Sequence, residues 1–76
     1  NFDFEIYPNP VAASIHIESK KPGAYDIEVI NSLGKRIISS RHSESITIDV
    51  QHQPQGLFIV IVNRAGQRQI KKLVKL

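Results

Sequence analysis

The stretch Gly56–Val62 reads Gly-Leu-Phe-Ile-Val-Ile-Val and decides the fold. Six apolar residues follow the glycine without a polar residue between them, and β-branched side chains dominate the run. Strands that are buried on both faces have such continuous apolar sequences, so we predict a central strand that is covered on both sides. A buried helix is the alternative, but the run is too short, and Pro54 before it and Asn63 and Gly66 after it are typical of turns.

Six other segments have the pattern of short strands. Their apolar residues mostly alternate with polar ones, as in strands with one buried face, and they cover residues 2–6, 14–18, 25–29, 35–41, 45–50 and 67–76. No segment of helical length shows an apolar period of about 3.6 residues. The sequence therefore predicts an all-β fold, namely an immunoglobulin-like antiparallel β-sandwich of about seven strands, with a small barrel as the alternative.

The core of such a sandwich consists of inward-facing residues from both sheets. In the last segment, Leu73 is expected on one side of the strand, and Ile70, Val74 and Leu76 on the other. We predict that the following residues form the core: Phe4, Ile15, Ile17, Tyr25, Ile27, Val29, Ile48, Phe58, Val60, Val62 and Leu73.

Proline, glycine and asparagine mark the connections between the strands. Residues 7–10, Tyr-Pro-Asn-Pro, predict a stiff and kinked connector, because proline lacks an amide donor and keeps the preceding residue extended. Residues 31–34, Asn-Ser-Leu-Gly, predict a type I turn with a left-handed glycine at its fourth position, and residues 63–66 repeat this spacing. Pro54 and Gly56 fit the second and fourth positions of another type I turn.

The charges are unevenly distributed along the chain. The formal net charge is +3, and every acidic residue lies at or before Asp49. The last thirteen residues are free of acids and form a basic C-terminal segment with Arg64, Arg68, Lys71, Lys72 and Lys75. One interpretation is that lysines on a terminal strand protect the edge of a sheet against unwanted pairing. The other is a recognition surface for another protein or for an anionic polymer.

Residues that carry out chemistry are absent or scattered. The chain has no cysteine, and its histidines, His16, His42 and His52, lie on three different segments without carboxylates at ligand spacing. No serine lies in a Gly-x-Ser-x-Gly motif. The basic C-terminal segment has no aromatic residue for stacking on bases. We therefore expect no metal site, no cofactor, no enzymatic activity and no nucleic-acid partner.

The length of 76 residues is that of one small domain, so we expect residues 1–76 to form a single domain. The longest apolar run is far below the roughly 20 residues of a membrane-spanning helix, and no transmembrane segment is expected. The sequence starts at Asn1 and contains no methionine, so we expect it to be a fragment of a larger protein.

Five segments taken together are similar to a known family. They are Phe4–Pro10, Ser14–Ile17, Asn31–Lys35, Pro54–Val60 and Lys71–Lys75. In this order and spacing, the Tyr-Pro-Asn-Pro motif, the later Pro-x-Gly-aromatic segment and the lysine-rich end resemble the C-terminal sorting domain of the type IX secretion system of Bacteroidetes. The resemblance covers nearly the whole chain. It departs at Phe58, where the family usually has tyrosine, so a hydrogen bond of the ring hydroxyl is missing here.

The resemblance implies a function for the domain. A domain of this family is the last domain of a larger secreted or surface protein and serves as a non-catalytic secretion signal. The outer-membrane translocon reads it in the periplasm, and a surface sortase commonly removes it at a site near or before Asn1. The implied partners are this secretion machinery and the N-terminal cargo domains of the parent protein. The implied location is the outer-membrane surface, where cargo can be joined to an anionic lipopolysaccharide, or the extracellular space.

The resemblance also divides the site residues into two groups. We expect the secretion machinery to read the last strand with its lysines, which means Lys71, Lys72, Leu73, Val74 and Lys75. We expect the family motifs mainly to set the fold, which concerns Tyr7, Pro8, Asn9, Pro10, Gly34, Pro54, Gly56 and Phe58. The alternative function is a fibronectin-like or carbohydrate-binding accessory module of an extracellular enzyme, although few aromatic residues remain for a sugar-binding surface once the core is filled.

Overall fold

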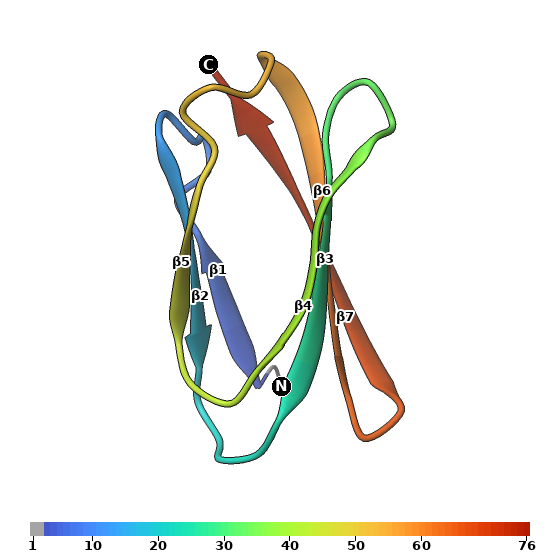
Figure 1. Cartoon of the computed structure of the whole chain (residues 1–76). Helices are drawn as coiled ribbons and strands as arrows, with labels where there is room; N and C mark the ends of the chain where they lie inside the picture. The colour runs from blue at the N-terminus through green and yellow to red at the C-terminus, as the bar shows by residue number, and fades with distance from the viewer. Residues whose placement is uncertain (1–2) are drawn as a thin grey trace.

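The computed structural model describes residues 3–76, and every regular element in this range is a β-strand (Figure 1). The strands are β1 (Phe4–Tyr7), β2 (Ser14–Ser19), β3 (Tyr25–Ile30), β4 (Arg36–His42), β5 (Ile46–Asp49), β6 (Gly56–Arg64) and β7 (Gln67–Lys75). The strands predicted from the sequence are thus confirmed, and β6 continues beyond Val62 to Arg64. Phe2, which the sequence places in the first strand, lies outside the described residues.

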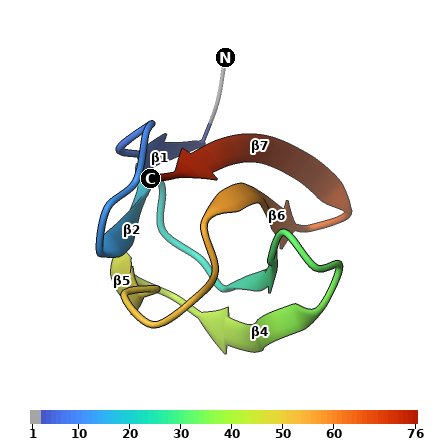
Figure 2. The same cartoon turned by 90° about the horizontal axis from the view of Figure 1, so that it is seen from above.

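The strands form two antiparallel sheets that lie on opposite sides of a common core (Figures 1 and 2). The first sheet has the strand order β1-β2-β5, and the second has the order β4-β3-β6-β7. In the second sheet, β6 lies between β3 and β7, and its Phe58 is opposite Leu73 of β7. Two separate antiparallel sheets confirm the predicted immunoglobulin-like sandwich rather than a barrel.

The core contains every residue that the sequence predicts for it, each no more than 5% exposed. The alternation of apolar and polar residues is sufficient to identify these positions, because successive side chains of a strand point to opposite faces. Three further core residues, Ile6, Val11 and Val50, were not predicted. Ile6 and Val50 continue the alternation of their segments and could have been included, although β5 itself ends at Asp49. Val11 lies outside the regular strands, where alternation gives no information about which side chain points inward.

The outer face of β6 differs from the prediction. Phe58, Val60 and Val62 point into the core and are buried, but on the other face Leu57 is 44% exposed and Ile59 and Ile61 are only partly buried. Within residues 3–76, no further layer covers this face (Figure 2). The prediction of a strand covered on both sides is therefore wrong, because a continuous apolar sequence does not reveal whether a second layer exists.

The turn between β3 and β4 has the predicted chemistry. Gly34 has a φ of +81° and donates its amide N–H to the carbonyl of Asn31 at 2.9 Å. The buried side chain of Asn31 accepts the amide N–H groups of Leu33 and Lys35 through Oδ1, at 2.9 and 3.0 Å. The prediction of a type I turn that ends with a left-handed glycine is confirmed.

The turn between β6 and β7 is different from the predicted one. Arg64 pairs with Gln67, so only Ala65 and Gly66 remain in the loop, and both have positive φ angles of 51° and 80°. Two central residues with positive φ define the type I′ hairpin turn. The prediction of a second type I turn over residues 63–66 is therefore wrong, because Asn63 and Arg64 still belong to the β6–β7 ladder.

Replacing Ala65 by Asn is expected to stabilise the domain. An L-residue other than glycine or asparagine in the left-handed region costs roughly 1 kcal/mol, and Asn-Gly is the preferred pair for a type I′ turn. The free energy of unfolding, measured in urea, should increase by about 0.5–1 kcal/mol. A decrease would contradict the turn assignment. Gln67→Asn, which lies outside the two central positions, is the control.

The loop before β6 also departs from the prediction. Its hydrogen-bonded turn joins Val50 and Gln53, with the N–H of Gln53 donating to the carbonyl of Val50 at 3.0 Å. This turn lies earlier in the chain than the predicted one because the Asp49 carboxylate accepts the N–H of Gln51 at 2.9 Å, which forms an Asx-turn. The hydrogen-bonded turn of this loop thus lies before the predicted one, in which Pro54 and Gly56 would take the second and fourth positions.

Candidate functional site

Apart from Arg64, the cations of the basic C-terminal segment lie on an edge strand. β7 is the last strand of the four-stranded sheet, and its predicted recognition residues alternate between the two faces. Lys71, Lys72 and Val74 are exposed, whereas Leu73 is fully buried and Lys75 is only 8% exposed. Within residues 3–76, Lys71 and Lys72 have no carboxylate within ion-pair distance. The accessible part of the predicted recognition group is therefore Lys71, Lys72 and Val74.

The Tyr-Pro-Asn-Pro connector lies against the end of β7. Asn9 Oδ1 accepts the amide N–H of Val74 at 3.0 Å. The amide N–H of Val11 donates to the carbonyl of Val74 at 2.7 Å, and the N–H of Leu76 donates to the carbonyl of Val11 at 3.0 Å. Pro8 and Pro10, each preceded by a cis peptide bond, are exposed. Thus the connector occupies the outer edge of β7 from Val74 onward.

Tyr7 is the first residue of this motif and ends β1. Its ring is 42% exposed and lies 5.2 Å from the ring of His16, centroid to centroid. The side chain of His16 in turn contacts Thr47 Oγ1 at 3.0 Å. Tyr7 is therefore an exposed aromatic residue on the outer face of the three-stranded sheet.

The later family motif holds two loops together. Gly56 has a φ of +122°, and a Cβ atom at this position would lie 2.9 Å from Cβ of Ser32. Ser32 Oγ also donates to the carbonyl of Gln55 at 3.0 Å. Pro54 in the same loop is exposed, and Phe58 is 1% exposed in the core. Glycine at position 56 thus permits both the backbone conformation and the close approach of the two loops.

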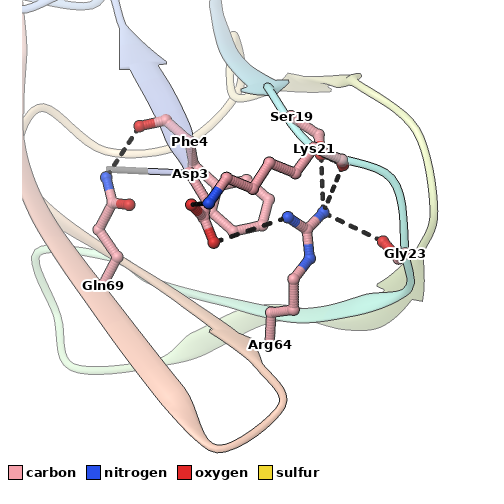
Figure 3. Close-up of polar contacts among 7 residues, drawn as sticks. All are labelled: Asp3, Phe4, Ser19, Lys21, Gly23, Arg64 and Gln69. Atoms are coloured by element: carbon pink, nitrogen blue, oxygen red, sulfur yellow. Dashed lines mark hydrogen bonds and ion pairs between the residues drawn. The ribbon is translucent and has the colours of Figure 1, made fainter. Parts of the chain in front are cut away.

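Arg64 forms a cluster that the sequence does not predict (Figure 3). Its side chain is only 13% exposed, and Nη2 donates to Ser19 Oγ at 2.8 Å and to the carbonyls of Lys21 and Gly23 at 3.0 Å. The guanidinium carbon lies 4.5 Å from the centre of the Phe4 ring. A residue at the end of β6 therefore fastens the β2–β3 connection and the first strand of the opposite sheet.

The same cluster contains an acid and a buried phenol. Asp3 lies 3.9 Å from Arg64 Nη1 and 3.2 Å from Lys21 Nζ. The Tyr25 hydroxyl donates to the carbonyl of Glu44, and burial raises the pKa of Tyr25, an effect that the positive charge of Arg64 opposes. Because the phenol must stay neutral in the fold, its contribution to stability is present at neutral pH and is lost as the pH rises above 10. The ion pairs of Asp3 and the hydrogen bond of Tyr25 stabilise the end of the sandwich at which the described chain begins (Figure 1).

Residues 3–76 contain no group of three or more histidine, cysteine, aspartate or glutamate side chains that could hold a metal ion. His16 and His42 lie in different sheets and contact hydroxyl groups of Thr47 and Ser40. In the same range, no helix is long and apolar enough to cross a membrane. β7 is an edge strand with the exposed cations Arg68, Lys71 and Lys72.

Comparison with known proteins places the chain in a family. The family model described as the secretion system C-terminal sorting domain matches residues 5–76, which is almost the whole chain. A search of curated proteins finds no match. The resemblance noted in the sequence is therefore confirmed, and the matched range includes the Tyr-Pro-Asn-Pro connector as well as β7. On this basis, the chain belongs to the family of secretion system C-terminal sorting domains of the type IX pathway.

Proposed function

We propose that this domain is a non-catalytic secretion signal that the outer-membrane translocon of the type IX system reads through β7. As a sorting domain, it directs a protein attached to it through the secretion system to the cell surface or the extracellular space. The exposed cations Lys71 and Lys72 on an edge strand are the observation that carries the more specific proposal. Such a strand offers both backbone groups for pairing and positive charge for steering a partner.

In this proposal, Leu73 and Lys75 of the predicted recognition group stabilise the folded domain and do not contact the translocon. Leu73 is fully buried and Lys75 is 8% exposed, so a partner cannot reach most of either side chain. Val74 presents an exposed side chain, but its backbone groups are bonded to Asn9 and Val11. The translocon therefore reads Lys71 and Lys72, while Leu73 and Lys75 keep the strand in place.

The domain is a substrate of the machinery in this scheme. The parent protein reaches the periplasm with the folded domain at its C-terminal side, the translocon exports it, and a surface sortase then cleaves near or before Asn1. The Arg64 cluster supports this order of events, because it fastens Asp3 and Phe4 to the sandwich and limits unfolding close to the junction with the cargo. The cargo is then released or joined to lipopolysaccharide.

A carbohydrate-binding module is less well supported. Sugar-binding surfaces use exposed aromatic rings. Three aromatic residues of this domain are at most 5% exposed, namely Phe4, Tyr25 and Phe58. Tyr7 is exposed but stands beside a histidine rather than a second exposed aromatic residue. A glycan-array signal that disappears in Tyr7→Ala would favour this alternative.

A reporter fusion tests the proposed function. A fluorescent protein with an inner-membrane signal peptide is fused to the N-terminus of residues 1–76 and produced in a bacterium that has a type IX system. We expect the reporter outside the cell or on its surface, and in the periplasm when the domain is omitted or when the translocon is deleted. Equal export with and without the domain would contradict the proposal. Deleting residues from Lys71 onward is a weaker test, because it also removes the buried Leu73.

A further inference from the structure

The outer edge of β7 is divided into an occupied and an open part. Val74 and Leu76 direct backbone groups away from β6, toward Asn9 and Val11. Because backbone groups of a strand alternate between its two sides, Arg68, Ile70 and Lys72 also direct their N–H and C=O groups away from β6. Within residues 3–76, these groups of Ile70 and Lys72 have no hydrogen-bond partner. The open part of the edge is thus Arg68–Lys72.

A groove runs beside this open edge. It is lined by residues of β1 and β7 and by Lys20, namely Phe4, Glu5, Ile6, Lys20, Gln69, Ile70 and Lys71. The two strands are joined across it by a side chain rather than by a ladder, since Gln69 Nε2 donates to the carbonyl of Phe4 at 3.0 Å. β1 and β7 are edge strands of different sheets, so the groove is the open seam of the sandwich.

The side chains on the open edge specify the chemistry of a partner strand. Arg68, Ile70 and Lys72 share the outer face of β7, in the order cation, apolar, cation, and Ile70 is 53% exposed. Directly opposed side chains of paired strands stabilise each other when their charges are opposite or both are apolar. The complementary strand therefore has an acid, an apolar residue and an acid at alternate positions.

The same charges disfavour a second copy of this chain as the partner. If two β7 strands paired in antiparallel fashion around Ile70, Arg68 of one copy would lie opposite Lys72 of the other. Like charges in directly opposed positions destabilise a strand pair. Cations on an edge are also a common protection against edge-to-edge association. Pairing of Arg68–Lys72 with a second copy of the chain is therefore unfavourable, whereas pairing with an acidic strand of another protein is favourable.

We propose that Arg68–Lys72 accepts an extended segment of a partner protein with the pattern acid-x-apolar-x-acid, which adds a strand to β7 over the groove. The proposal rests on the proposed function, in which the partner belongs to the secretion machinery. The N–H and C=O groups of Ile70 and Lys72 bind its backbone, and Arg68 and Lys72 bind its acids. The connector at Asn9 and Val11 ends the site at Val74.

Peptide binding to the 76-residue chain tests this site. The probe is acetyl-Thr-Glu-Thr-Ile-Thr-Glu-Thr-amide, and the control peptide has lysine in place of both glutamates. We expect the acidic peptide to slow amide hydrogen exchange at Ile70 and Lys72, and the lysine peptide to bind at least roughly tenfold more weakly. Equal affinity of the two peptides, or protection confined to other amides, would overturn the proposal. So would dimerisation of the chain itself through the same amides.

Two variants separate the contribution of the backbone from that of charge. Lys72→Pro removes an outward amide, which an edge strand tolerates, whereas Lys72→Thr removes the charge and keeps the amide. Binding of the acidic peptide should be lost in Lys72→Pro and weakened in Lys72→Thr. Equal binding by both variants would exclude strand addition.

A third variant reverses the charges of the site. The double variant Arg68→Glu with Lys72→Glu should prefer the lysine peptide to the acidic one. If it does not, although its melting temperature is unchanged, the charge pairing is excluded. Export that needs Lys71 and Lys72 without amide protection at Ile70 would leave the sorting function intact and remove the strand addition.

Discussion

Replacing Leu73 by Ala is expected to lower the free energy of unfolding by about 3 kcal/mol, because the side chain is fully buried and its loss leaves a cavity. Leu73 lies opposite Phe58 in the β6–β7 pair and is the inward-facing apolar residue by which the last strand is anchored in the core. Domains of this size are stable by only about 5–10 kcal/mol, so the loss is a large share of the total. Export of a fused reporter should fall with the folded fraction.

The measurement is urea unfolding of the wild-type chain and of three variants. Leu73→Met, which conserves volume, should cost less than about 1.5 kcal/mol. Val74→Ala, on the neighbouring and exposed position, should change stability by no more than roughly 0.5 kcal/mol. If Leu73→Ala cost as little as Val74→Ala, Leu73 would not anchor the strand. If it abolished export without loss of stability, Leu73 would be read directly by the partner.

Replacing Arg64 by Ala is expected to cost about 3 kcal/mol. Nη2 has two N–H groups, which it shares among Ser19 Oγ and the carbonyls of Lys21 and Gly23, and two hydrogen bonds contribute about 1 kcal/mol each. The contact of the guanidinium with the Phe4 ring contributes roughly 0.5–1 kcal/mol in addition. The hydrogen bonds and the ring contact together amount to about 3 kcal/mol.

Two substitutions control for charge in the Arg64 experiment. Arg64→Lys retains the charge but loses the planar fork and its stacking on Phe4, so it should lose about half of the same free energy. Arg68→Ala removes an exposed cation near the same hairpin and should be nearly neutral, within roughly 0.5 kcal/mol. Thermal unfolding in low and high salt provides the readout, because hydrogen bonds to carbonyls persist in salt. If Arg64→Ala and Arg68→Ala lowered the free energy of unfolding equally, the stabilising role of the Arg64 cluster would be contradicted.

The strands and most of the core could be predicted from the sequence because they depend on local patterns. Alternation places Ile15 and Ile17 of β2, and Tyr25, Ile27 and Val29 of β3, on inward faces, and the structure buries all of them. The Asn31–Gly34 turn was predictable for the same reason, since its bonds lie within one short segment.

The features that the sequence did not reveal depend on contacts between distant segments. An arginine after an apolar strand is usually solvated, and only the fold brings Arg64 to Ser19, Lys21 and Phe4. Lys75 is buried because the connector with Val11 packs beside it in a parallel bridge. No local pattern indicates either contact.

The candidate site was only partly predictable. The cationic end of the chain is visible in the sequence, and the resemblance to sorting domains led to the prediction that the secretion machinery reads it. Which cations are accessible depends on the inward turn of Leu73 and on the connector over Val74. These contacts are the reason why we propose Arg68–Lys72, rather than Lys71–Lys75, as the accessible site.

The central claim is that the secretion machinery reads the cations of β7 on a folded domain. Export of the reporter fusion with Lys71→Gln and Lys72→Gln tests it most directly. The matched control is Arg36→Gln with Arg41→Gln, which removes two exposed cations from β4, the opposite edge of the same sheet. With both domains folded, we predict that the lysine pair reduces export at least about tenfold, a loss of roughly 1.4 kcal/mol in recognition, and that the arginine pair leaves export unchanged. Normal export by the folded lysine variant, or an equal loss in both, would contradict the claim.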